Sequence, residues 1–344
     1  MLRLKAMSPH ELEIVTNLTQ SISEVNVSAL PHPIQYQGSK RHLATRILEH
    51  FPDDVQTLYE PFAGSAAMSI AAAARGVARH FVINDLNQPL AKLLQSMVEN
   101  PQATSDVYSA VWAAQGEGPT QSVAHFNVVR ERFNQTQEPE LLLYLLARCI
   151  KGAVRYNRDG LFNQSPDKRR KGTLPKTMQR NIFGISYLLK GRSSFSSLDY
   201  RRAIEGANEH DLIYMDPPYQ GVSGERDGRY LAGLAFDVFV ESLAALNQRG
   251  ISYIVSYDGK LGERVYGQEL PERLQLERLE LDAGRSSTAS LLGRDDVTVE
   301  SLYLSKPLTQ RLSKSSGAKV PSMQPDLSTL FPSSYDAETI EAVH

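Results

Sequence analysis

The stretch VQTLYEPFAGSAAMSIAAAARGVARHFVIND, residues 55–85, holds two short runs of apolar, β-branched and aromatic residues with a helical stretch between them. Residues 55–61 and 80–85 are typical of buried strands. Residues 66–75, which are followed by Gly76, are typical of a helix with a glycine C-cap. This stretch therefore predicts a strand, a helix and a second strand in direct succession.

The same alternation returns later, with strands predicted at residues 211–219 and 251–258 and helices at 89–98 and 236–249. Strands that alternate with helices favour an α/β fold with a parallel, doubly wound sheet. Residues 273–283 and 296–305 alternate apolar and polar side chains, which predicts an antiparallel pair of strands at the sheet edge.

Between the two halves of this pattern the chain changes to helices around a polar, basic loop. The helices are predicted at residues 107–114, 123–133, 141–150 and 178–189. We interpret residues 101–192 as an inserted, mostly helical subdomain that divides a catalytic domain into residues 31–100 and 193–305. Residues 1–30 are left as an N-terminal extension. Residues 306–344 are rich in Ser, Lys and Pro, which predicts a disordered tail.

Composition is that of an ordinary globular protein of 344 residues, 41% hydrophobic and 22% charged. Glu11 and Glu13 interrupt the apolar core that a signal peptide needs, and no apolar run is long enough to cross a bilayer. These features predict a cytoplasmic protein without membrane contacts. The single cysteine, Cys149, excludes a disulfide framework and a cysteine-rich zinc site, and no metal is expected.

The formal net charge of −2 hides an uneven distribution. Residues 151–192 contain eleven Lys and Arg against two Asp, so this segment carries +9 and the remainder of the chain −11. A basic surface on an otherwise acidic protein is typical of a polyphosphate-binding face. A solvated basic loop without a partner is the open alternative.

The turn Glu60-Pro61-Phe62-Ala63-Gly64-Ser65 lies between a predicted strand and a predicted helix. Gly64 allows a tight turn and close approach of a ligand, and Asp85, at the end of the next strand, can accept hydrogen bonds from a ribose. A structural glycine turn and a helix-capping role for Asp85 are the alternatives. The turn lacks a phosphate cradle and spaced glycines, so a nucleoside joined to an amino acid, S-adenosylmethionine, fits best.

The most specific motif is Asp216-Pro217-Pro218-Tyr219, directly after a predicted strand. Two prolines form a stiff turn without amide donors. An exocyclic amine of a base could donate one N–H to the Asp216 carboxylate and the other to the Pro217 carbonyl, which would free its lone pair for methyl transfer. Tyr219 would stack on a base flipped out of the helix. This scheme needs alignment rather than a metal.

Two further stretches fit the same scheme. Tyr36 to Lys40 precede a predicted helix, so Lys40 could pair with the carboxylate of the cofactor's methionine part. Asp199 follows a serine-rich turn and could lie near the adenine of the cofactor.

In this motif order the chain resembles the Dam-type (alpha-group) DNA adenine-N6 methyltransferases over roughly residues 33–304. Residues 155–163, RYNRDGLFN, are similar to the start of the family's DNA-recognition insertion. Arg285 to Ser287, Arg294 and Glu300 are similar to its last motif. The family usually has tryptophan at the position of Tyr36 and a double glycine where Gly38 and Ser39 stand.

The resemblance implies a Rossmann-like class I methyltransferase fold, S-adenosylmethionine as cofactor, and N6 methylation of a flipped-out adenine in double-stranded DNA. The candidate catalytic residues are Asp216, Pro217, Pro218 and Tyr219. The candidate cofactor-binding residues are Tyr36, Lys40, Glu60, Phe62, Gly64, Asp85, Asp199 and Asp216. The candidate DNA-binding residues are Arg155, Asn157, Arg158, Lys168, Arg169, Arg170, Lys171 and Lys176.

Several alternatives stay open at this point. The methylated group could be cytosine N4, an RNA base or a protein glutamine, and the chain could be a DNA-binding regulator without catalysis. A cognate restriction endonuclease is a conceivable additional partner.

Overall fold

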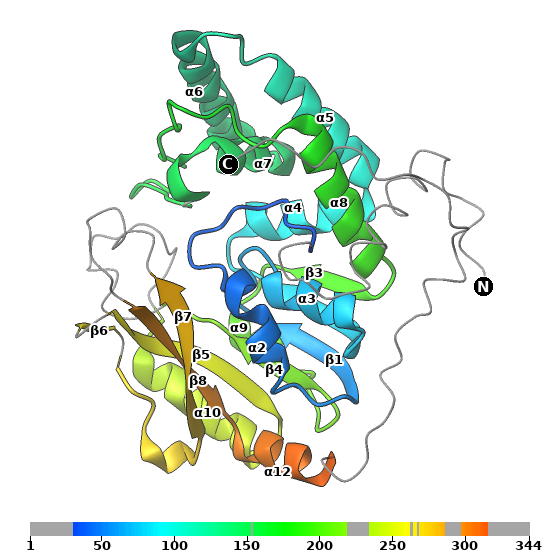
Figure 1. Ribbon diagram of the computed structural model, residues 1–344, viewed down its shortest axis with the longest axis vertical. Coiled ribbons are helices and arrows are strands. Elements are labelled where there is room, and N and C mark those ends of the chain that lie inside the picture. The colour runs from blue at the N-terminus through cyan, green and yellow to red at the C-terminus, as the bar shows by residue number, and fades with distance from the viewer. Residues whose placement is uncertain are drawn as a thin grey trace.

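Figure 1 shows the computed structural model, which describes residues 30–152, 154–218, 234–261, 264–266, 268–285 and 297–315. A twisted sheet with helices on both faces forms one lobe, and a group of helices forms a second lobe above it. Helix α4, Gln88–Glu99, lies between the two lobes and contacts helices of the upper one.

The sheet has eight strands within the described residues: β1 (Val55–Glu60), β2 (Ala78–Asn84), β3 (Ser193–Ser196), β4 (Leu212–Met215), β5 (Tyr253–Leu261), β6 (Arg264–Tyr266), β7 (Glu277–Arg285) and β8 (Val297–Leu304). Their order is β3-β2-β1-β4-β5-β8-β7, with β6 beside β5. Strands β3 to β5 in this order are parallel, whereas β8 is antiparallel to both β5 and β7. This topology confirms the predicted α/β sheet and its antiparallel edge pair.

The helices of the sheet lobe are α2 (Ala44–Leu48), α3 (Ala67–Arg75), α4, α9 (Tyr200–Ala203), α10 (Phe236–Gln248) and α12 (Lys306–Ser315), with 3₁₀ turns η3 (Lys40–Leu43) and η5 (Glu272–Leu274). Successive residues of a strand point to opposite faces of the sheet. Leu212 and Tyr214 therefore join the core beneath α3 and α4, whereas Ile213 and Met215 join the core beneath α10. Strand β4 is therefore covered on both faces, and the chain leaves it at the carboxyl end after Met215.

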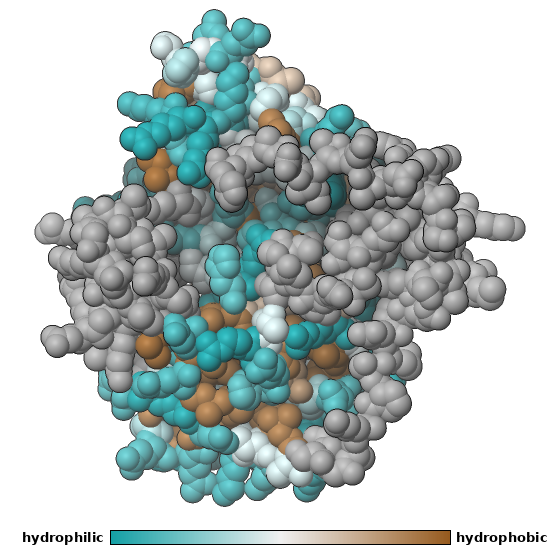
Figure 2. Space-filling model, viewed as in Figure 1, coloured by the Kyte–Doolittle hydropathy of each residue, from teal (hydrophilic) through white to brown (hydrophobic). Residues whose placement is uncertain are grey.

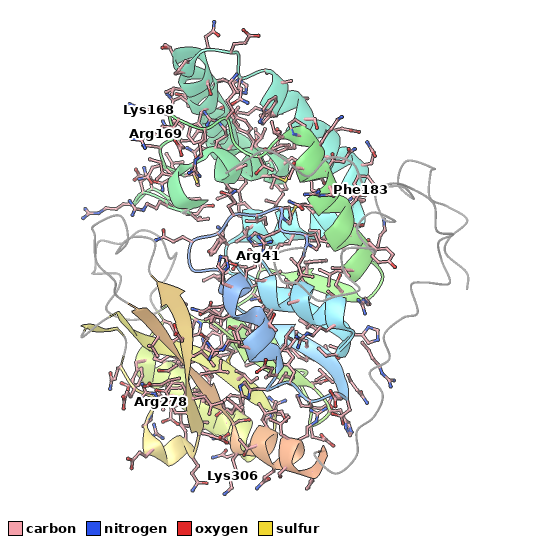
Figure 3. All side chains as sticks on the ribbon, viewed as in Figure 1. Arg41, Lys168, Arg169, Phe183, Arg278 and Lys306 are labelled. Carbon is pink, nitrogen blue, oxygen red and sulfur yellow. The ribbon has the colours of Figure 1, made fainter. Side chains whose placement is uncertain are left out.

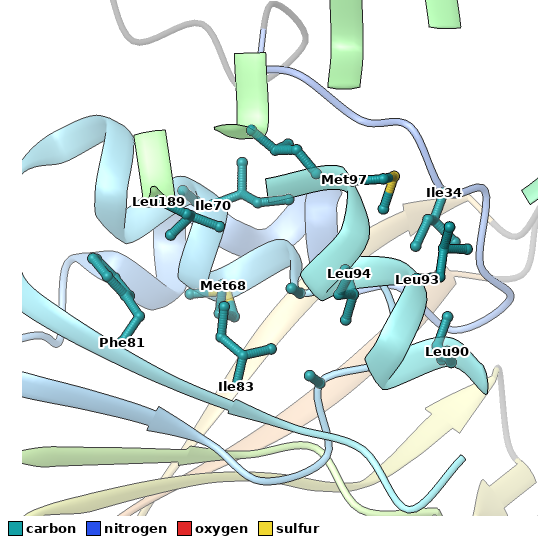
Figure 4. Close-up of a cluster of buried hydrophobic side chains, with 14 of the residues drawn as sticks. Ile34, Met68, Ile70, Phe81, Ile83, Leu90, Leu93, Leu94, Met97 and Leu189 are labelled. Carbon is teal, nitrogen blue, oxygen red and sulfur yellow. The ribbon is translucent and has the colours of Figure 1, made fainter. Parts of the chain in front are cut away.

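The first of these cores holds α3, α4 and β2 together (Figure 4). Met68 and Ile70 of α3 lie near Leu94 and Met97 of α4, above Ile83 of β2. All five side chains are at most 2% exposed, and each such side chain contributes about 1.5–3 kcal/mol when it is buried. The loop between β1 and α3 is thus held by well-buried elements at both of its ends.

The upper lobe contains α5 (Pro101–Ala113), α6 (Pro119–Thr136), α7 (Pro139–Arg148) and α8 (Pro175–Leu189), with a 3₁₀ turn η4 (Ile150–Gly152). A proline occupies the first turn of each of the four helices, where its fixed φ suits the helix and its missing N–H costs nothing. The helices begin two to six residues before the predicted starts, because the polar first turns carry no apolar periodicity. Hydrophilic residues cover most of the coloured surface of this lobe (Figure 2).

Three features differ from the expectations. Strand β3 was not predicted, because its residues SSFS lack an apolar pattern and the strand forms by backbone pairing with β2. Residues 273–276 do not belong to β7: Leu274 is buried within η5, and Gln275 has φ 53°.

The third correction concerns the expected disordered tail, whose first ten residues form α12. Leu308 is fully buried, and Arg311 donates to the main-chain oxygens of Asp54, His210 and Asp211. These anchors come from distant parts of the chain, so local composition could not reveal them. Within the described residues, no helix is long and apolar enough to cross a membrane, and no cluster of three metal-ligating side chains is present.

Candidate active site at the carboxyl ends of the parallel strands

A cavity of about 250 Å³ lies where β1, β2 and β4 end. The chain runs from β1 outward through β2 to β3 and then returns to β4 on the other side of β1. Ligands of open α/β sheets bind at such a switch point. The described candidate residues that line the cavity are Tyr36, Lys40, Glu60, Phe62, Gly64, Asp85, Asp199, Asp216, Pro217 and Pro218. Tyr219 lies outside the described residues.

The glycine turn after β1 is fixed by Asp85. One carboxylate oxygen of Asp85 accepts from the Gly64 N–H at 2.8 Å, and the other accepts from the Asn87 N–H at 2.9 Å. Gly64 has φ 51°, and a Cβ there would lie 3.0 Å from Cε1 of Tyr36. The turn therefore needs glycine for both its conformation and its contact with Tyr36. The Asp85 side chain therefore stabilises the turn and also lines the cavity.

Asn84, the residue before Asp85, is a fully buried residue that sequence reasoning missed. Its Nδ2 donates to the carbonyls of Pro61 and Leu198, both at 3.0 Å. Its Oδ1 accepts from Ser196 Oγ and from the Leu198 N–H. One carboxamide thus joins the loops after β1 and β3, which form opposite parts of the cavity wall. Its only sequence signal was its place at the end of a strand.

Glu60, at the end of β1, caps helix α3 from within the cavity wall. Its two carboxylate oxygens accept from the N–H groups of Met68 and Ser69, at 3.3 and 2.9 Å, and one also accepts from Ser69 Oγ. Burial raises the pKa of Glu60 to about 7, although these hydrogen bonds oppose the shift, and Asp216 raises it further. The helix N-terminus, a usual phosphate site, is already filled by a carboxylate.

Lys40, the first residue of η3, forms an ion pair with Asp216, the residue that follows β4. Its Nζ lies 2.9 Å from Oε2 of Glu300 and 3.4 Å from Oδ1 of Asp216. The three side chains are only 7%, 18% and 22% exposed, so solvent screens the ion pairs weakly. Glu300 comes from β8 next to a register shift between β5 and β8, where a bulge redirects side chains. The arrangement holds the Asp216 carboxylate at the cavity.

Asp199 and Phe62 lie on the α9 side of the cavity. Asp199 caps α9 through the Arg201 N–H and pairs with the Arg201 guanidinium at 2.8 Å. The hydrogen bond from the Arg201 side chain lowers the pKa of Asp199. The Phe62 ring lies 5.1 Å from that of Tyr200, as a tilted pair. This side therefore combines an anion with a flat apolar wall.

The charged described residues that line the cavity are Glu60, Asp85, Asp199 and Asp216 against Lys40 alone. Tyr156, which the sequence placed with the DNA-binding run, also lines the cavity, and its hydroxyl donates to Asn87 Oδ1 at 3.2 Å. Burial raises the pKa of Tyr156 to about 12, so its hydroxyl stays neutral. An acidic, partly aromatic cavity suits a cationic organic ligand.

The candidate DNA-binding residues lie in the upper lobe, and none of them lines the cavity, although Arg155 and Asn157 flank Tyr156, which does. All seven cationic candidates are exposed, and Lys168 and Arg169 lie at its outer edge (Figure 3). Asn157 differs from them, because its Oδ1 accepts from the N–H groups of Asp159 and Leu161 and so shapes a tight turn. Its side-chain oxygen is thus used by the protein itself.

An open α/β sheet with an acidic cavity at its switch point and an Asp-Pro-Pro turn in the cavity wall defines an enzyme fold for nucleoside-like ligands. Residues 36–281 match the family model described as D12 class N6 adenine-specific DNA methyltransferase. The match covers more than half of the chain, and the protein belongs to this family. The membership confirms the predicted class I methyltransferase fold and the predicted family of N6 adenine-specific DNA methyltransferases.

Relatives with curated names agree with this assignment at modest identity. The chain is 24% identical over 257 residues to "DNA adenine methylase" of Haemophilus influenzae, which covers 71% of this chain and 86% of that protein. It is 25% identical over 235 residues to "DNA N-6-adenine-methyltransferase" of Escherichia phage P1, over 65% of this chain but 29% of the phage protein. It is 22% identical over 259 residues to "Type II methyltransferase M.FokI" of Planomicrobium okeanokoites, over 70% and 39% of the two chains.

Proposed function

We propose that this protein transfers a methyl group from S-adenosylmethionine to N6 of an adenine that is flipped out of double-stranded DNA. The observation that carries the proposal is the position of Asp216. It follows the fully covered strand β4, precedes two prolines, lines the acidic cavity and lies 3.4 Å from Lys40.

The residues of the cavity fit S-adenosylmethionine. Three aspartates and the partly ionised Glu60 outweigh one ammonium and favour a ligand with a net positive charge, and this cofactor carries a sulfonium and an ammonium against one carboxylate. Each carboxylate oxygen of Asp85 accepts one backbone N–H and keeps a further lone pair for a ribose hydroxyl. Because Glu60 fills the N-terminus of α3, a nucleotide phosphate would meet a carboxylate there.

We assign Tyr36, Phe62, Gly64 and Asp199 to the nucleoside part of the cofactor. When bound, S-adenosylmethionine supplies an electrophilic methyl group. Lys40 was predicted to pair with the cofactor's carboxylate, but it already faces Asp216 and Glu300. We therefore assign Lys40 to the orientation of Asp216.

The chemistry of Asp216 follows from its acceptor atoms. The lone pair of the adenine amine is delocalised into the ring, which makes the nitrogen a weak nucleophile. If one N–H donates to the Asp216 carboxylate and the other to the Pro217 carbonyl, the lone pair is less delocalised and points to the methyl group. Such preorganised hydrogen bonds and alignment each supply several kcal/mol in enzymes. Tyr219 as the stacking partner of the base stays a prediction, as do a partner restriction endonuclease and a cytoplasmic location.

The test is methyl transfer by wild type, Asp216→Ala and Asp216→Asn, with labelled S-adenosylmethionine and double-stranded DNA, RNA or protein as substrate. We expect labelled N6-methyladenine in DNA with the wild type, and a loss of at least about 10²-fold with both variants while DNA binding persists. Asp53→Ala, at an exposed turn, serves as the control. Label in RNA or protein only, or unchanged turnover of both variants, would contradict the proposal.

A further inference from the structure

The basic loop, residues 165–173, is held from beneath by buried polar side chains of the upper lobe. The Tyr108 hydroxyl of α5 donates to the Thr173 carbonyl at 2.5 Å. Gln115 Nε2 donates to the Lys171 carbonyl at 3.4 Å, and Arg148 Nη1 of α7 donates to the Asp167 carbonyl at 3.0 Å. These three donors are 0%, 2% and 2% exposed.

The donors belong to one buried network. Arg148 Nη2 donates to Ser122 Oγ at 2.6 Å, and Ser122 Oγ donates to Gln115 Oε1 at 3.3 Å. The loop fits closely over this network, because a Cβ at Gly172, which has φ 81°, would lie 2.9 Å from Cδ of Arg148. A buried hydrogen-bond network with close packing restricts the loop backbone to one conformation.

The direction of these hydrogen bonds determines which charged and polar groups of the loop face solvent. Three of its carbonyl oxygens point inward to donors, whereas Lys168, Arg169 and Arg170 are exposed. Partial negative charges are thus turned away from the outer face, and positive charges are turned toward it. The face is complementary to phosphates before any ligand arrives.

Arg148 adds an electrostatic argument. Within the described residues no carboxylate oxygen lies within 4.0 Å of its guanidinium nitrogens, and its buried Nε has no hydrogen-bond partner. A buried guanidinium that is held by neutral acceptors, Ser122 Oγ and the Asp167 carbonyl, keeps its positive charge without a neutralising anion beside it. Its charge lies directly beneath the basic loop and adds to the positive potential there.

We infer that Tyr108, Gln115 and Arg148 are positioning residues that hold the basic loop in its DNA-binding conformation, so that little ordering is required when DNA binds. This inference rests on the proposed function and on the prediction that the basic residues of the loop contact the DNA backbone.

The experiment measures DNA affinity at several salt concentrations, S-adenosylmethionine affinity and thermal stability. Tyr108→Phe removes one donor and keeps the ring. Gly172→Ala disturbs the same contact from the loop side. Thr104→Val is the matched control, because it removes an equally buried hydroxyl of α5 whose partners, the Asn100 carbonyl and Ser96 Oγ, lie outside the loop and its network.

We expect Tyr108→Phe and Gly172→Ala to weaken DNA binding about three- to tenfold with an unchanged salt slope, because the same phosphates are contacted once the loop is ordered. Cofactor affinity should stay at the wild-type value, and amide hydrogen exchange in residues 167–173 should become faster. Thr104→Val should bind DNA like the wild type.

The double variant Arg169→Glu with Arg170→Glu distinguishes a failure of the positioning role from a failure of the loop as the DNA-binding face. If this variant loses affinity and salt slope while Tyr108→Phe and Gly172→Ala bind normally, the positioning role is wrong and the DNA face stands. If the charge reversal has no effect, the loop is not the DNA face and the positioning role is overturned with it. Equal losses of DNA and cofactor affinity in Tyr108→Phe would also contradict the inference, because they indicate a general effect on the fold.

Discussion

The cavity at the strand ends and the basic loop of the upper lobe are both built from irregular backbone, but they are held in opposite ways. In the cavity, the carboxylates of Glu60 and Asp85 accept from backbone N–H groups. In the loop, Tyr108 and Arg148 donate to backbone carbonyls. The cavity therefore presents acceptors in a shielded space, and the loop presents cations to solvent. The first suits an amine and a cationic cofactor, and the second suits phosphates.

The largest effect is expected from Lys40→Met, which removes the cation from the shielded cavity and leaves Asp216 and Glu300 without it. Repulsion between the two carboxylates should displace Asp216, and we expect kcat to fall about 10²-fold or more, with DNA affinity retained. Turnover assays with saturating cofactor and DNA measure this, and exposed Lys92→Met is the control. A turnover within twofold of wild type would contradict the role of Lys40 in the orientation of Asp216.

A smaller effect is expected from the double variant Arg169→Glu with Arg170→Glu, which reverses two charges on the exposed basic loop. DNA affinity at physiological salt should fall about 10- to 10²-fold, and the slope of log K against log salt should fall by about two. Cofactor affinity should not change. The double variant Arg79→Glu with Lys92→Glu makes the same change in net charge at exposed positions of the sheet lobe. An equal loss in that control would mean that overall charge, rather than the loop, governs binding.

Gly64→Ala tests the close contact within the cavity. A side chain at φ 51° is strained by about 1–2 kcal/mol, and its Cβ would press on the Tyr36 ring. We expect cofactor affinity to fall about tenfold, measured by calorimetry, with DNA affinity unchanged. Gly160→Ala has a similar positive φ but no atom within 4 Å of the added Cβ, so it carries the strain without the contact. Similar cofactor affinities in the two variants would show that the Tyr36 contact is unimportant.

The smallest effect concerns pH. The pKa of Glu60 is raised from its ordinary value of 4.5 to about 7 in the folded protein. The folded state thus holds the proton more tightly, and this contribution to stability is complete below about pH 4.5 and is lost as pH rises to about 7. Glu60→Gln cannot titrate, so the difference in unfolding free energy between wild type and variant should change over this interval, by at most about 1.4 kcal/mol per pH unit. A constant difference across this range would contradict the raised pKa.

The sequence predicted the parallel strands β1, β2, β4 and β5, most helices and the motifs at 60–65, 85 and 216–218, because local periodicity and turn residues carry that information. It could not predict β3, whose four residues are held by backbone pairing, or α12, which is anchored by Leu308 and by the contacts of Arg311. It also missed Asn84, since a carboxamide that joins two loops has no distinct local signal.

The sequence by itself determined the order of strands and helices, the Asp-Pro-Pro turn after a buried strand and the excess of cations in residues 151–192. These features depend on neighbouring residues. Only the tertiary structure decided that Lys40 faces Asp216 and Glu300, which lie 176 and 260 positions away along the chain. It also decided that Tyr108 lies beneath the basic loop. Contacts between distant segments depend on how the elements pack, and packing is set by the whole core at once.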